Sequence, residues 1–141
     1  MQKEYAMRWL LVLPAFALIG GVTATTANTR EDNERARQDA KLATILKGLT
    51  PGKPQDCINL RETQSTDRVG DKIVYRVGRS RAYVTDTGGG CFGLARGDAI
   101  VTKTYSSQLC RGDIAETVDL FAGFHSGSCT IGSFTPYVAT K

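Results

Sequence analysis

The apolar residues of this chain follow three successive patterns, and each pattern predicts a different kind of segment. A continuous uncharged stretch runs over the 14 residues from Trp9 to Val22. Residues 30–49 then show the spacing of a helix with one apolar face. From Cys57 onward, short stretches rich in β-branched residues alternate with glycine and proline, which is typical of β-strands and turns.

The first pattern is typical of an export signal. Lys3 and Arg8 supply positive charge before the apolar run, and small residues follow it at Val22-Thr23-Ala24. We expect cleavage after Ala24, with Ala27 as the second choice. The alternative is an uncleaved anchor, which needs about 20 apolar residues to cross the hydrocarbon core of a bilayer.

The second pattern predicts a helix over residues 30–49 after a short leader at 25–29. Thr29 followed by Asp32 resembles a capping box at the start of the helix, and either Gly48 or the Pro51-Gly52 turn is expected to end it. The first half is charged and is expected to be solvated. The second half is expected to pack through four residues on one face: Leu42, Ile45, Leu46 and Leu49.

The third pattern predicts a β-rich domain over residues 50–141. Strands are expected at 57–60, 72–77, 81–85, 99–105 and 129–134, with 114–120 ambiguous between a strand and a helical turn. Gly78-Arg79-Ser80 would join two of these strands in a hairpin. The predicted fold class is therefore mainly β (α+β): a small antiparallel sheet, sandwich or barrel with one N-terminal helix.

Composition limits the domain count and the class of partner. Without residues 1–24 the chain has 117 residues, enough for one domain. It would keep 16 basic and 13 acidic side chains, a net charge of +3. A nucleic-acid partner is not expected, because such binders cluster far more positive charge. Contact with a membrane is expected only through the export segment before cleavage.

The four cysteines, Cys57, Cys91, Cys110 and Cys129, favour two disulfides in an exported chain. A zinc site or a redox-active pair would usually contain a Cys-x-x-Cys spacing, and none is present. No metal is expected. Spacing alone leaves all three pairings of four cysteines open.

Catalytic motifs are sparse. His125 is the single histidine, and we expect it in an exposed loop rather than as a base acting with Ser126 or Ser128. Residues 88–93 satisfy G-x-G-x-x-G, but no helix of useful length follows, so we interpret them as a flexible loop that carries a disulfide. No catalytic residue and no cofactor are predicted.

Two other polar motifs are interpreted as turns. Arg111-Gly112-Asp113 matches an adhesion tripeptide, but a tight turn with Gly112 at positive φ and Asp113 bonded to nearby amides is favoured. Four aspartates in turn-like contexts lack the spacing of a calcium loop and are expected to be solvated: Asp67, Asp71, Asp86 and Asp98.

The predicted hairpin offers the best candidate ligand-binding surface. It gathers arginines and tyrosines, which can grip carboxylates or phosphates and stack on rings. The candidate residues are Tyr75, Arg76, Arg79, Arg81 and Tyr83. Alternation along a strand places Tyr75 and Arg76 on opposite faces, which favours a solvated hairpin over a single binding surface.

Three segments resemble a family of small exported proteobacterial proteins of the sphingomonad type, whose function is unknown. They are residues 49–61 around Cys57, Ser106 to Ile114 with its Leu-Cys-x-Gly-Asp core, and Gly132-x-Phe134-x-Pro136-Tyr137. The resemblance covers about residues 45–138. It implies an envelope location and a compact domain, but no catalytic residues. Some members keep only the cysteines that match Cys57 and Cys110, which implies that pair and leaves Cys91 with Cys129.

The function expected from these observations is that of a non-enzymatic periplasmic or secreted protein. Its partner would be an unknown envelope protein or a small anionic ligand. Two alternatives stay open: a small secreted hydrolase or inhibitor-like protein that uses His125, and a structural component that associates with itself.

Overall fold

A computed structural model of the chain describes residues 25–140, and the predicted export segment at residues 1–24 lies outside them. Within this part, one helix precedes ten strands and a short 3-10 turn. The elements are α1 (Thr25–Ile45), β1 (Leu49–Pro51), β2 (Cys57–Asn59), η1 (Leu60–Glu62), β3 (Ser65–Val69), β4 (Lys72–Val77), β5 (Arg81–Asp86), β6 (Ala99–Thr102), β7 (Gln108–Cys110), β8 (Ile114–Asp119), β9 (Phe124–Thr130) and β10 (Thr135–Ala139).

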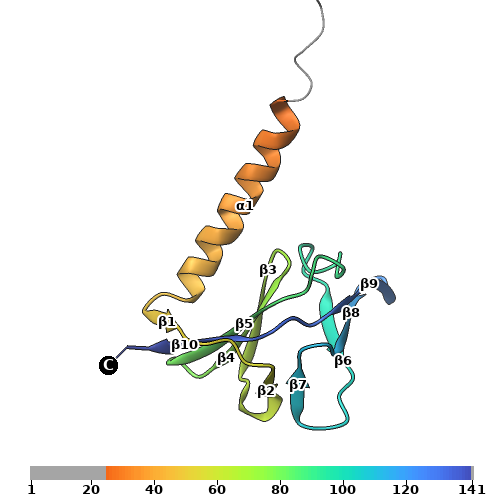
Figure 1. Cartoon of the computed structure of the whole chain (residues 1–141). Coiled ribbons are helices and arrows are strands. Elements are labelled where there is room, and N and C mark those ends of the chain that lie inside the picture. Colours follow the sequence, from red (N-terminus) through yellow and green to blue (C-terminus); the bar gives the residue numbers. More distant parts are fainter. Residues whose placement is uncertain (1–24, 141) are drawn as a thin grey trace, which may run out of the picture.

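The strands form three antiparallel sheets (Figure 1). The largest has the order β1-β10-β5-β4-β3, so the last strand of the chain lies between the first strand and the central hairpin. A three-stranded sheet has the order β6-β8-β9, and β2 pairs with β7. The predicted fold class, mainly β with one N-terminal helix, is confirmed. The sheets of the described part are open, and no closed barrel forms among them.

One apolar cluster joins the three sheets. Phe134 and Ile73 are fully buried at its centre, and the Phe134 ring meets Tyr75 edge-on at a centroid distance of 6.0 Å. The other buried members come from β2, β7, β8, β9 and the segments that follow β5 and β9: Ile58, Cys91, Leu94, Leu109, Ala115, Cys129 and Ile131. Because every sheet contributes to this cluster, the sheets form one folded unit.

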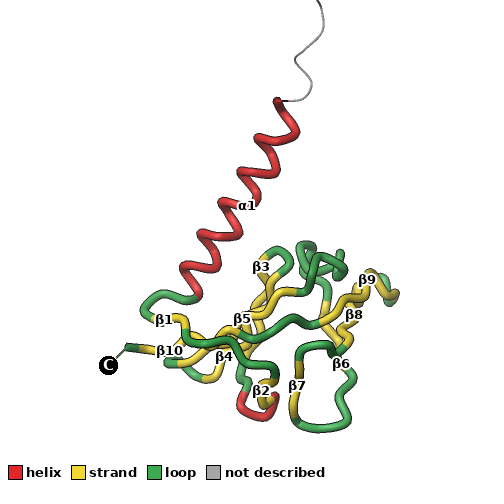
Figure 2. The backbone as a smooth tube through the Cα atoms, viewed as in Figure 1, coloured by secondary structure: helices red, strands yellow, loops and turns green. Residues whose placement is uncertain are grey.

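The opposite face of the five-stranded sheet is covered by the end of α1. Leu46 is buried there against Val74, Ala82 and Val84. Leu42, Ile45 and Leu49 pack around this second cluster, so the predicted apolar face of the helix is confirmed. The first half of the helix extends away from the sheets (Figure 2), whereas Lys41 still donates to the Arg68 carbonyl of β3 at 2.9 Å; side chains are mostly exposed from residue 29 to residue 41.

The bounds of the helix differ from the prediction at both ends. It begins at Thr25 rather than residue 30, since residues 25–29 contain no glycine or proline that would end it. Thr29 is therefore inside the helix and not a capping residue. The helix ends at Ile45, and Gly48 with φ of 80° lies in the turn that leads into β1.

The predicted central hairpin is confirmed as β4 and β5. Val77 pairs with Arg81, and Gly78 takes a φ of 68° in the connection. The ambiguous segment 114–120 forms a strand, β8, that ends at Asp119.

The strand predicted at 129–134 is wrong, because two strands share this region. β9 ends at Thr130 and β10 begins at Thr135. Between them Gly132 crosses β5 at close range, where its N–H donates to the Asp86 carbonyl at 2.8 Å. Pro136 does not end the last strand but lies within it, where it pairs with Tyr83 of β5 and its carbonyl accepts from the Gly52 N–H at 2.7 Å.

Candidate functional site

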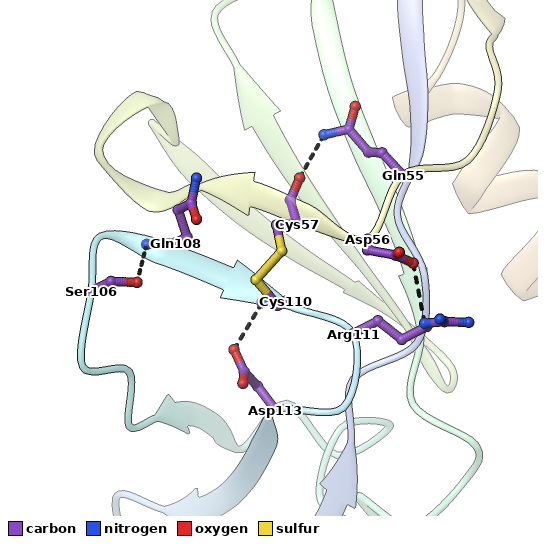
Figure 3. The surroundings of a disulfide bond; sticks show 8 residues. All are labelled: Gln55, Asp56, Cys57, Ser106, Gln108, Cys110, Arg111 and Asp113. Atoms are coloured by element: carbon purple, nitrogen blue, oxygen red, sulfur yellow. Dashed lines mark hydrogen bonds and ion pairs between the residues drawn. A yellow bond between two sulfur atoms is a disulfide. The ribbon is translucent and has the colours of Figure 1, made fainter.

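The two disulfides join Cys57 to Cys110 and Cys91 to Cys129. This is the pairing that the family resemblance implied. Cys57 and Cys110 are directly opposite each other on β2 and β7 and are partly exposed (Figure 3). Cys91 and Cys129 are buried in the core cluster. Such bonds are typical of an oxidising compartment outside the cytoplasm.

The Arg-Gly-Asp tripeptide forms the predicted tight turn. Gly112 has a φ of 94°, and the Asp113 carboxylate accepts a hydrogen bond from the Cys110 N–H at 2.8 Å (Figure 3). Arg111 forms an ion pair with Asp56 at 3.1 Å. Since both charged side chains have partners within the chain, the geometry supports a structural turn.

The glycine-rich motif at residues 88–93 carries a disulfide as predicted, and it is closely packed only in part: Gly88 and Gly89 border open space, whereas Gly90 and Gly93 do not. A Cβ on Gly90 would lie 2.8 Å from the Ser128 carbonyl oxygen. A Cβ on Gly93 would collide with the side chains of Asp98 and Ser126. The glycines therefore let this segment pass directly against β9, where Cys91 forms its disulfide with Cys129.

The hairpin residues proposed as a ligand site do not form one surface. Tyr75 is 5% exposed and belongs to the core cluster, where burial raises the pKa of its hydroxyl to about 12. Tyr83 pairs with it on the same face. Arg76 lies on the other face and binds Asp67 at 2.9 Å, whereas Arg81 faces Glu62 at 3.8 Å.

Arg79, the remaining member of that set, lies exposed in the β4–β5 turn. The structure therefore separates the five residues into two buried or half-buried tyrosines, two arginines with carboxylate partners and one exposed arginine.

The four aspartates of the predicted turns have separate partners. Asp67 is bound to Arg76, the Asp71 carbonyl accepts from Thr87, and the Asp86 carboxylate accepts from the Gly88 N–H. Within residues 25–140, no group of three or more histidine, cysteine or acidic side chains is arranged to hold a metal ion.

Asp98 contradicts the prediction of a solvated turn residue, because its side chain is only 9% exposed. Hydrogen bonds from the Ser126 hydroxyl and from Arg96 lower the pKa of its carboxyl. The Arg96 Nη2 atom lies 3.0 Å from Asp98 Oδ2, and Arg68 donates to the Asp98 carbonyl at 2.6 Å. These contacts connect three parts of the chain: strand β3, strand β9, and the segment that precedes β6.

His125 lies within β9, so the prediction of an exposed loop is wrong. Its side chain is nevertheless exposed, and its Nδ1 atom lies 3.3 Å from Glu116 Oε2 on β8. Ser126 and Ser128 border the same open depression. The Ser126 Oγ atom, however, is buried next to Asp98, whereas the His125 side chain is exposed, which leaves this hydroxyl poorly placed to act as a nucleophile with the histidine.

The outer face of the β6-β8-β9 sheet carries a second depression, next to the first, with Glu116 on the border of both. Ala115 and Thr117 of β8 are buried, so alternation places Ile114 and Glu116 on the outer face. We call this feature the β6–β8 depression. It has a volume of about 330 Å³ and is lined by Val101, Lys103, Tyr105, Gly112, Asp113, Ile114 and Glu116.

Its apolar walls are unusually accessible. Ile114 is 62% exposed, and Tyr105 is fully exposed on the segment after β6. Lys103 adds one positive charge, and Asp113 and Glu116 add two negative charges. The sequence does not predict this feature, because Val101 and Ile114 come from strands whose pairing register decides which side chains face outward.

The connection between β8 and β9 presents another apolar group, which we call the β8–β9 tip (residues 119–124). Leu120, Phe121 and Phe124 are 78%, 103% and 53% exposed. The only signal in the sequence is an apolar run, Leu-Phe-Ala-Gly-Phe, at a position where a turn would usually be polar.

No helix in the described part of the chain is long and apolar enough to cross a membrane. No family model, no curated protein and no solved structure matches the chain. The two disulfides and these exposed features are therefore what indicates its function.

Proposed function

We propose that this chain is an exported, non-enzymatic binding domain that docks an envelope protein in the β6–β8 depression. The single observation that carries the proposal is the exposed apolar wall of Val101, Tyr105 and Ile114 on a sheet whose other face is tied into the core. Contiguous exposed apolar side chains with polar neighbours are typical of protein interaction sites.

Three features support a protein rather than a small anionic ligand as the partner. The depression is open and shares its border with a second one, so the available surface is broad. Its charged lining includes Glu116 and Asp113 beside a single lysine, a poor match for an anion. The arginines of the β4–β5 hairpin that could bind an anion are already paired, apart from Arg79.

Export from the cytoplasm is part of the same proposal. The two disulfides support an oxidising compartment. The pattern of residues 1–24 supports a signal peptide that directs the chain there. The similarity of three segments to small exported proteobacterial proteins supports the bacterial periplasm or the medium, and we propose that relationship as well.

A photo-crosslinking amino acid at position 114 tests the docking site in intact cells. We expect a covalent adduct with one envelope protein. The matched control is position 138, because Val138 is also an exposed apolar strand residue, 44% exposed, but lies on β10. Failure to form an adduct at 114, or equal adducts at both positions, would contradict the proposal.

One observation favours a second candidate function, a small hydrolase. The Glu116 carboxylate contacts His125 Nδ1, which is how an acid orients a catalytic imidazole. Replacing His125 by alanine separates the two functions. Loss of a hydrolytic activity with the fold intact would favour the enzyme, whereas retention of the crosslinked partner would favour the binding domain.

A further inference from the structure

The β8–β9 tip exposes three large apolar side chains within five residues. Phe121 makes so little contact with the rest of the chain that its accessibility equals that of an unfolded residue, and Leu120 is 78% exposed. Exposing such side chains to water is unfavourable by an amount that grows with apolar area. A cluster of this kind at a strand connection therefore needs a reason other than packing.

The backbone of the tip is held in one shape by its own hydrogen bonds. The Asp119 carboxylate accepts from the N–H groups of Phe121 and Ala122, both at 2.9 Å. The Gly123 N–H donates to the Asp119 carbonyl at 2.8 Å, and Gly123 has a φ of 73°. Three consecutive N–H donors are thus satisfied within the turn, so their transfer out of water costs little.

The tip also offers no free charged side chain with which to bind a polar partner. Asp119 is its only charged residue, and the carboxylate is occupied by the turn. Neither depression on the outer face of this sheet is lined by Leu120, Phe121 or Phe124, so the group belongs to neither of them. It lies at the end of the β8–β9 hairpin, at the edge of the molecule (Figure 1).

We propose that the β8–β9 tip inserts Leu120 and Phe121 into the surface of a lipid bilayer, with Phe124 at the boundary. A bilayer accepts protruding apolar side chains without a complementary cavity, whereas a protein partner would need a pocket shaped for them. The sequence alone predicts membrane contact only through the export segment, and this contact would be a second one.

This proposal does not depend on the protein partner of the β6–β8 depression. Ile114 and Phe121 lie near opposite ends of β8, and Ile114 pairs with Thr130 whereas Asp119 pairs with Phe124. Substitutions at one end can therefore be made without altering the other.

Tryptophan fluorescence provides a direct test, because Trp9 is the single tryptophan of the chain. The full chain with Trp9→Phe would carry Phe121→Trp as its only reporter. The control carries Tyr105→Trp in the same background, since Tyr105 is equally exposed but lies on the segment between β6 and β7. Circular dichroism and intact disulfides would verify that both variants fold.

The probe is a vesicle of phosphatidylethanolamine and phosphatidylglycerol, with and without brominated acyl chains. We expect emission from the reporter at position 121 to shift to shorter wavelength and to be quenched by bromine. Both effects should persist from low salt to 1 M salt, where the screening length falls to about 3 Å. Emission from the reporter at position 105 should stay water-like. Adding Leu120→Ser and Phe124→Ser should reverse the shift at position 121.

Four outcomes would overturn the proposal. A spectrum at position 121 that stays water-like excludes insertion, and equal shifts at both reporters indicate non-specific adhesion. A shift that disappears in 1 M salt assigns the binding to surface charges rather than to the tip. If a crosslinker at position 121 captures an envelope protein while the fluorescence there stays water-like, the tip serves a protein and not a bilayer.

Discussion

Asp98 is the residue at which three separate parts of the chain meet. Its carboxylate accepts from Ser126 of β9 and from Arg96, and its carbonyl accepts from Arg68 of β3. These partners hold the start of β6 against two other strands. The same contacts favour the ionised carboxylate, which is why its pKa is lowered.

The lowered pKa predicts how stability depends on acid. A carboxyl whose pKa is lower in the folded state stabilises the fold above its unfolded value of 3.8, and this contribution is lost as pH falls through the folded value. We expect Asp98→Asn to destabilise the protein at neutral pH. The difference from wild type should shrink below pH 3.8, as measured by thermal unfolding across a pH series. A difference that stayed constant down to the most acid samples would contradict this.

Gly127 of β9 illustrates a role that depends on distant residues. A Cβ at this position would lie 2.9 Å from the Phe92 nitrogen and 3.1 Å from the Gly90 carbonyl oxygen. We expect Gly127→Ala to lower the free energy of unfolding by about 1–3 kcal/mol, because backbone atoms would have to move to make room for the methyl group. Urea denaturation measures this cost. Gly52→Ala is the control, since its nearest contact is a proline side chain at 3.3 Å, and a similar loss there would refute the argument.

At the scale of elements, the two disulfides differ in how they are embedded. Cys57 and Cys110 connect a short, partly exposed ladder, whereas Cys91 and Cys129 lie inside the core cluster. A reductant must reach a sulfur atom before it can attack it. Accessibility therefore sets the expected order of reduction.

Mild reduction should open Cys57–Cys110 before Cys91–Cys129. Alkylation at increasing dithiothreitol, followed by peptide mass mapping, would reveal the order. Replacing both cysteines of either disulfide by alanine should lower the free energy of unfolding by about 2–5 kcal/mol. The loss should be larger for Cys91 and Cys129, because a core contact disappears as well. Simultaneous opening of both bonds at every reductant concentration would argue against the difference in embedding.

The sequence predicted those helices and strands that have one clearly apolar face. It did not predict strands whose formation depends on pairing with distant parts of the chain. The second half of α1 and the β4–β5 hairpin follow clear helical and alternating patterns, and both form. β3, with the sequence Ser-Thr-Asp-Arg-Val, was not predicted because it is an edge strand with polar side chains. β9 was placed too late in the chain because its residues 124–128 include exposed polar side chains and a glycine.

At the scale of the whole molecule, stability depends on one cluster shared by three sheets. Phe134 lies at its centre without belonging to a named strand, and it is held by reciprocal backbone hydrogen bonds with Gln55 at 2.8 and 2.9 Å. Because all three sheets contact this cluster, they should unfold together.

Phe134→Ala should lower the free energy of unfolding by about 3–5 kcal/mol. The midpoint of unfolding should fall by the same amount whichever spectroscopic signal is followed. Tyrosine fluorescence and far-UV circular dichroism would follow the loss of tertiary packing and of secondary structure. Val138→Ala on the exposed end of β10 should have little effect. Two separate transitions in the Phe134 variant would indicate that the sheets are less coupled than the shared cluster implies.

The candidate sites were less predictable than the fold. The hairpin arginines and tyrosines stand out in the sequence, but pairing places the tyrosines inward and gives Arg76 and Arg81 carboxylate partners. The β6–β8 depression combines residues from positions 101 to 116 whose exposure depends on register. Local patterns carry no information about that register, so this surface emerges only from the folded chain.

The order of the disulfides along the chain has a consequence for survival among proteases. The span from Cys57 to Cys110 overlaps the span from Cys91 to Cys129. A single cut at any peptide bond between residues 57 and 129 therefore separates the two halves of at least one cystine. The resulting pieces stay covalently joined, so a nicked molecule keeps its strands together and can retain its shape. Only a second cut, or reduction, would release a fragment.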